Sequence, residues 1–130
     1  MLEIGMTLTL TTTVTEDKTA RAMKSGTLDV FATPAMIALM EETAYKTVAD
    51  SLDEGMGTVG TYLAVKHLAA TPLGMTVTCK AELVEIDNRR LVFKVAAYDE
   101  AGIIGEGDHE RFIVQNEKFM AKTNAKSTHN

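Results

Sequence analysis

Two polar residues lie where the sequence pattern predicts buried side chains. Glu41 follows Ile37 by four residues, which places it on or beside the apolar stripe of a predicted helix. His67 shares the parity of Leu63 and Val65 in a predicted strand, and therefore its apolar face. Each has a structural explanation on its own, because an edge glutamate can reach water and a core histidine can be satisfied by hydrogen bonds. Together they predict a general base, since a carboxylate raises the basicity of an imidazole and fixes its tautomer.

Thr33 is the third candidate, because it precedes Pro34 at the predicted start of the same helix. A helix N-cap would explain it structurally. Its hydroxyl would also stand at the positive helix end, where the amides of Ala35 and Met36 can stabilise an oxyanion. Thr33 and Glu41 are separated by roughly 12 Å of helical rise, so one imidazole cannot bond to both along one axis. Either Thr33 departs from the axis or the site is assembled across a dimer interface, and we favour the interface.

Three other motifs carry less chemistry. Residues 55–60 read Gly-Met-Gly-Thr-Val-Gly, but a helix precedes them and a strand follows, the reverse of a dinucleotide site. Gly60 still predicts the close approach of a ligand or backbone, as glycines inside strands often do. Cys79 shares a face with apolar residues and reads as a core residue. His109 and its neighbours match no metal-ligand spacing, so we expect no metal site.

Changes in hydrophobic period divide the chain into elements. The predicted elements are a strand at Met6–Thr15, a loop at Glu16–Asp29, a helix from Ala35 to about Leu52, strands at Val59–Ala69, Met75–Ile86, Arg90–Asp99 and Ile103–Asn116, and a flexible tail from about Lys122 to Asn130. Short connections predict that the last four strands form an antiparallel meander, with the helix packed on it. This is an α+β fold of the hotdog type in one domain, 1–130, and its exposed sheet edges favour a homodimer.

Composition excludes several classes of protein. The chain has 130 residues, with 13 basic and 18 acidic side chains and a net charge of −5, which does not suit a nucleic-acid binder. We expect no membrane partner, because no apolar run approaches the roughly 20 residues that span a bilayer. The single cysteine and the absence of a signal-peptide pattern at the N-terminus predict a cytoplasmic protein.

Several short motifs resemble those of the fluoroacetyl-CoA thioesterase family of hotdog enzymes. These are Val30–Thr33, Leu39–Glu41, His67–Pro72, Gly74–Thr78, His109–Arg111 and Glu117–Phe119. The resemblance runs from about Val30 to Lys122. It implies a catalytic set of Thr33, Glu41 and His67, and it places Gly60, Arg111 and Phe31 among the residues that contact the substrate.

The expected function is hydrolysis of a short-chain acyl-CoA to the free acid and CoA, with no cofactor. The family's fluoroacetyl-specific enzyme has a longer segment with phenylalanines before the helix, whereas Thr19–Asp29 is short and has no aromatic residue. A different short acyl group is therefore expected. Pro34 replaces a family glycine and removes an amide donor. A hotdog enoyl-CoA hydratase or dehydratase and a non-catalytic acyl-CoA binding module are the alternatives.

Overall fold

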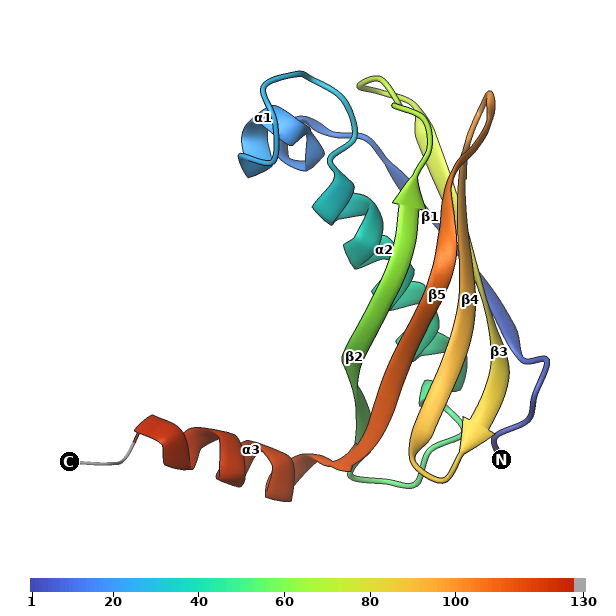
Figure 1. The fold of residues 1–130 in the computed structure, drawn as a ribbon, viewed down its shortest axis with the longest axis vertical. Coiled ribbons are helices and arrows are strands. Elements are labelled where there is room, and N and C mark those ends of the chain that lie inside the picture. Colours follow the sequence, from blue (N-terminus) through green and yellow to red (C-terminus); the bar gives the residue numbers. More distant parts are fainter. Residues whose placement is uncertain (128–130) are drawn as a thin grey trace.

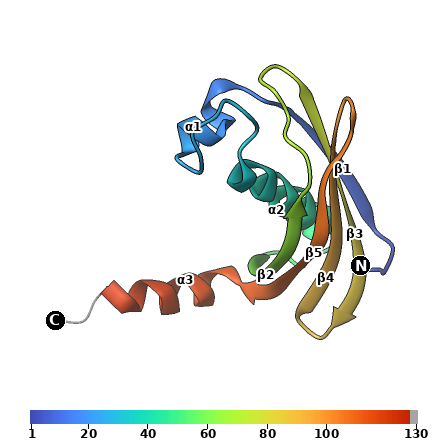
Figure 2. The same ribbon diagram turned by 45° about the horizontal axis from the view of Figure 1, so that its top comes forward.

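The computed structural model describes residues 1–127. Its elements are β1 (Thr7–Thr13), the 3-10 turn η1 (Glu16–Lys18), α1 (Ala20–Met23), α2 (Thr33–Ala49), β2 (Met56–His67), β3 (Thr76–Asp87), β4 (Arg90–Asp99), β5 (Gly102–Gln115), α3 (Asn116–Asn124) and the 3-10 turn η2 (Ala125–Ser127). The five strands form one antiparallel sheet that curves around α2 (Figures 1 and 2). The predicted α+β hotdog fold is confirmed.

The order of strands in the sheet differs from the predicted meander. It runs β1-β3-β4-β5-β2, so β2 lies beside β5 at the far edge and does not pair with β3 (Figure 1). Only β3, β4 and β5 follow one another as hairpins. The meander prediction assumed that neighbours in sequence pair, but residues 68–75 form a connection long enough to cross the end of the sheet. As a result, β2 is an edge strand.

The core lies between the inner face of the sheet and α2. Alternate residues of β3 and β4 face the helix, which is the two-residue period expected of strands with one buried face. The fully buried core side chains include Met36, Met40, Ala44, Val48, Val77, Cys79, Ala81, Leu83, Leu91 and Phe93. The prediction that Cys79 is a core residue is therefore confirmed, and burial raises the pKa of its thiol.

The buried face of α2 is also more polar than predicted. Two threonines, Thr43 and Thr47, are buried there together with Leu39, whereas Ile37 is only half-buried. The helix also ends at Ala49, before the predicted Leu52. The two threonines are satisfied locally, because each hydroxyl donates to the carbonyl four residues earlier, at 2.7 Å. This internal bonding removes the cost that a buried hydroxyl would otherwise carry.

The C-terminal segment is helical where a flexible tail was predicted. α3 begins at Asn116, and the Gln115 side chain caps it by accepting from the amide of Lys118 at 2.7 Å. The helix extends away from the sheet and buries none of its residues (Figure 1). It was missed because a polar helix carries no apolar stripe. Residues 128–130 of the predicted tail lie outside the described part. No described helix is long and apolar enough to cross a membrane.

Candidate functional site

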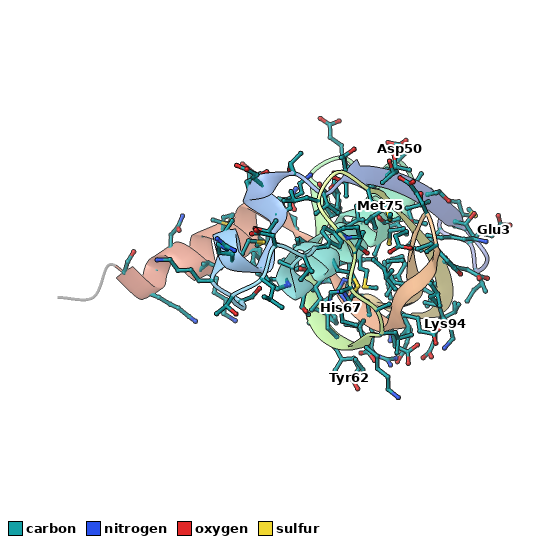
Figure 3. The ribbon with its side chains drawn as sticks, turned by 90° about the horizontal axis from the view of Figure 1, so that it is seen from above. Glu3, Asp50, Tyr62, His67, Met75 and Lys94 are labelled. Atoms are coloured by element: carbon teal, nitrogen blue, oxygen red, sulfur yellow. The ribbon has the colours of Figure 1, made fainter. Side chains whose placement is uncertain are left out.

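Thr33 and His67 meet at the N-terminal end of α2. Thr33 is the first residue of α2 and His67 is the last residue of β2, so the fold brings two element ends together. Seen from above, His67 lies against the α2 ribbon (Figure 3). The Thr33 hydroxyl oxygen is 2.7 Å from Nδ1 of His67. Thr33 is not the N-cap, because Ala32 occupies that position, so the capping explanation of Thr33 is wrong.

The second ring nitrogen of His67 has an unmet requirement. Nε2 is buried and bonds to none of the described residues. When the Thr33 hydroxyl donates to Nδ1, the neutral ring carries its proton on Nε2, and that proton needs an acceptor. An unsatisfied buried donor costs roughly 1–3 kcal/mol. Burial lowers the pKa of His67, with the backbone at Ala69 opposing the shift, so the ring is neutral near pH 7 and able to take a proton.

Glu41 and Arg111 form a second cluster. Oε2 of Glu41 lies 3.5 Å from Nη1 of Arg111, and the Glu41 side chain is 38% exposed whereas that of Arg111 is 8% exposed. Nε of Arg111 donates to the Thr58 hydroxyl at 2.8 Å, and Nη2 donates to the Thr58 carbonyl at 3.0 Å. The guanidinium also lies 5.7 Å from the centre of the Tyr45 ring. Burial lowers the pKa of Arg111, and the charge of Glu41 opposes that shift.

Gly60 lets the carboxylate of Glu41 approach the sheet. A Cβ at position 60 would lie 2.6 Å from Oε2 of Glu41 and 3.2 Å from Nη1 of Arg111. A side chain at position 60 would therefore require the Glu41 carboxylate to move. The group that approaches Gly60 is a side-chain carboxylate, not the ligand or backbone that the sequence predicted, and the role of Gly60 in substrate binding stays a prediction.

The two clusters lie at well-separated points along β2 within one subunit. Glu41 contacts position 60, and His67 is seven residues farther along the strand. One of these is the bulge after Gly60, so the separation is roughly 20 Å at about 3.3 Å per residue. Glu41 therefore does not orient His67 of its own chain, because its partner there is Arg111. Both positions nevertheless face α2, because the bulge after Gly60 restores their common face. Gly60 pairs with Arg111 and His67 pairs with Gly105, and these two partners lie on the same face of β5.

Thr33 and His67 line a pocket of about 520 Å³ together with Phe31. Phe31 is 1% exposed, so it forms a fixed part of the wall. The remaining wall comes from the segment between α1 and α2 and from the end of β2. Its residues are Ala20, Ser25, Gly26, Thr27, Leu28, Val30, Leu68, Ala69 and Ala70. Phe31 is the one aromatic residue in this wall.

Sequence analysis gave no role at the site to His109, Thr58 or Tyr45, yet all three surround Arg111. His109 is fully buried on the inner face of β5. A signal was present, because His109 and Arg111 alternate on the strand face that should be apolar. The sequence gives no reason for two buried polar residues on this face, because Glu41 of α2 comes beside them only in the folded structure.

The family of fluoroacetyl-CoA-specific thioesterases matches residues 14–117. Over 99 residues the chain is 46% identical to a fluoroacetyl-CoA thioesterase from Streptantibioticus cattleyicolor, a match that covers 76% of this chain and 71% of the relative.

Solved structures agree with this match over almost the whole chain. The fluoroacetyl-CoA thioesterase FlK superposes with a TM-score of 0.92 at 39% identity, covering 97% of this chain and 98% of FlK. A hypothetical protein of Thermus thermophilus, described as a thioesterase superfamily member, gives a TM-score of 0.90 at 30% identity, covering 98% and 94% of the two chains.

Proposed function

The chain belongs to the family of fluoroacetyl-CoA-specific thioesterases and is a thioester hydrolase; from that premise we propose that it hydrolyses a short-chain acyl-CoA at a site shared by two subunits. Thr33 and His67 come from one subunit and Glu41 from the other. The observation that carries the proposal is the buried, unpartnered Nε2 of His67 beside a hydroxyl already bonded to Nδ1. A carboxylate is the acceptor that this nitrogen lacks.

The exposed edge of the sheet supports this pairing of subunits. β2 has a partner strand on one side only, and Tyr62 and Leu63 are 52% and 37% exposed on it. An edge strand with unpaired backbone groups is a template for another strand. If two β2 strands pair antiparallel about Ala64, and the bulge after Gly60 takes up the extra residue Thr61, Gly60 of one strand stands opposite His67 of the other.

That register places Glu41 within reach of the imidazole. Residues opposite each other in an antiparallel pair project from the same face, with Cβ atoms about 4.5–5.5 Å apart. The carboxylate of Glu41 already sits over position 60, on the face that His67 shares. Glu41 of one subunit therefore lies beside His67 of the partner subunit. A homodimer then has two equivalent sites.

The side chains at this site support an acyl-transfer sequence without a cofactor. His67 takes the Thr33 proton at Nδ1, and the Thr33 oxygen attacks the thioester carbonyl. The amide of Ala35 and the positive start of α2 stabilise the oxyanion. The amide of Met36 is committed elsewhere, since it donates to the Ala32 carbonyl at 3.0 Å. The C–S bond breaks, CoA leaves with the proton from His67, and water cleaves the acyl-threonine in the same way.

We place the acyl group in the pocket beside Thr33. The wall formed by residues 20–30 has no aromatic side chain, and Phe31 closes the pocket from the core side. This supports a short acyl chain that differs from fluoroacetyl. The substrate is the acyl-CoA itself, and the cytoplasm, where acyl-CoA esters are held, is the proposed location.

Thiol release from a panel of acyl-CoA esters tests the proposal. We expect wild-type protein to release CoA, and Glu41→Gln and His67→Ala to lose activity by about a hundredfold or more. Glu42→Gln is the matched control, because Glu42 pairs with Lys46 at 2.6 Å on the outer face of α2 and should leave activity intact. Wild-type activity in both site variants would end the proposal.

The same panel separates the alternatives. A hydratase or dehydratase would change the enoyl absorbance without releasing thiol. A binding module would gain thermal stability with acyl-CoA and turn over nothing. Mass spectrometry of rapidly quenched protein tests the acyl-threonine step. An acyl adduct on Thr33 supports it, and single-turnover hydrolysis with no adduct would instead assign the attack to water.

A further inference from the structure

His109 makes two polar contacts from a fully buried position. Its Nε2 lies 3.1 Å from Nη1 of Arg111, and its Nδ1 lies 2.8 Å from the carbonyl oxygen of Tyr62. Its ring also packs at 6.3 Å from the ring of Phe93, between centroids. A hydrophobic residue would fill this space at lower cost, because a buried polar ring is tolerated only when its hydrogen bonds are made.

The chemistry of arginine determines which nitrogen of His109 carries the proton. A guanidinium has only donors, so Nη1 of Arg111 must donate and Nε2 must offer a lone pair. The proton of the neutral ring is then on Nδ1 and is donated to the Tyr62 carbonyl. Burial lowers the pKa of His109, with Arg111 adding to the shift and the Tyr62 backbone opposing it, which agrees with a neutral ring.

The contact with His109 holds one end of a fully engaged guanidinium. The Nε and Nη2 atoms of Arg111 are bound to Thr58, while Nη1 lies between His109 and Oε2 of Glu41. Without an acceptor at His109, the rigid guanidinium plane can tilt about its two contacts with Thr58, which moves Nη1, and the carboxylate loses its fixed partner. Tyr62, which accepts from His109, adjoins the β-bulge after Gly60, where the backbone makes room for Glu41.

We propose that His109 is a positioning residue that holds Arg111. Through Arg111 it directs the Glu41 carboxylate toward His67 of the partner subunit. The inference rests on the proposed function, in which Glu41 is the catalytic carboxylate. His109 touches neither substrate nor reacting atoms. It acts by presenting a lone pair where Arg111 needs one.

Two substitutions at position 109 separate the two ring contacts. In His109→Gln the amide oxygen reaches the place of Nε2 and accepts from Arg111. In His109→Asn the shorter amide reaches only the place of Nδ1, so the Tyr62 contact remains and the acceptor is lost. We expect kcat to fall about ten- to hundredfold in the asparagine variant, since small misplacements of a catalytic group have effects of this size, and to recover largely in the glutamine variant.

A double substitution tests whether His109 acts through Glu41. In a Glu41→Gln background, His109→Asn should have no further effect on residual kcat, because the group it positions is already gone. Equal loss in both position-109 variants that persists in this background would mark a general packing role and overturn the inference. Unchanged kcat in His109→Asn would also overturn it.

A measurement on the wild-type protein covers the case in which the variants fail to fold. Nitrogen NMR of the imidazole should find the neutral His109 ring protonated at Nδ1, and protonation at Nε2 would overturn the inference. Failure of the proposed function is distinguishable, because wild-type protein would then release no thiol, or Glu41→Gln would keep full activity.

Discussion

Two inactive variants are expected to restore each other's activity when mixed, because in the proposed dimer each site takes His67 from one subunit and Glu41 from the other. In a heterodimer of Glu41→Gln and His67→Ala, one site carries both substitutions and the other carries neither. The separation of Glu41 and His67 along β2 within one chain is the structural reason for this prediction. The register that we infer brings them together only between chains.

The expected magnitude follows from the symmetry of the dimer. Random exchange of equal amounts makes half of the dimers mixed, and each mixed dimer has one intact site of two, so activity recovers to about a quarter of the wild-type value. Heterodimers isolated by two different affinity tags should reach about half. The assay is CoA release at saturating acyl-CoA, measured after the two variants are co-expressed or refolded together.

Two further mixtures serve as controls. Thr33→Ala with His67→Ala should not recover, because both residues belong to the same half of each site. Glu41→Gln with Arg111→Ala should not recover for the same reason, since the structure places both in the second cluster. If the mixture of Glu41→Gln and His67→Ala contains heterodimers but recovers no activity, the shared site is refuted. Recovery in all three mixtures would refute the division of residues between subunits.

Gly60→Ala is expected to lower kcat about tenfold or more, because its Cβ would lie 2.6 Å from Oε2 of Glu41 and displace that carboxylate. Gly57→Ala meets the Asn116 side chain at the same 2.6 Å but lies away from Glu41, so it should leave kcat unchanged, and equal losses in the two variants would contradict the reasoning. Burial lowers the pKa of His67 below its ordinary 6.5, while the partner's carboxylate would favour the protonated ring. The pKa of His67, followed by NMR, should therefore fall further in Glu41→Gln, and an unmoved titration would argue against the contact.

The local pattern of apolar and polar residues was sufficient to predict most helices and strands of this protein. The Arg90–Asp99 strand has the bounds that its alternation and flanking turns predicted, and the fully buried Cys79 follows from the same two-residue period. His67 could also be assigned to the inner face from parity, whereas Gly60 shares that face only because a β-bulge follows it. Each property assigned from the pattern depends on a side chain's neighbours along the chain, which the sequence states directly.

Tertiary structure decided which residues meet. β2 crosses to pair with β5, and that choice brings Gly60 beside Arg111, which is 51 positions later. Arg111 contacts Glu41 across 70 positions, and this partner of Glu41 within its own chain could not be read from spacing. Thr33 turned to His67 instead of capping its own helix, because the ends of α2 and β2 coincide in space. Long-range contacts of this kind depend on how whole elements pack, and short sequence motifs do not specify that packing.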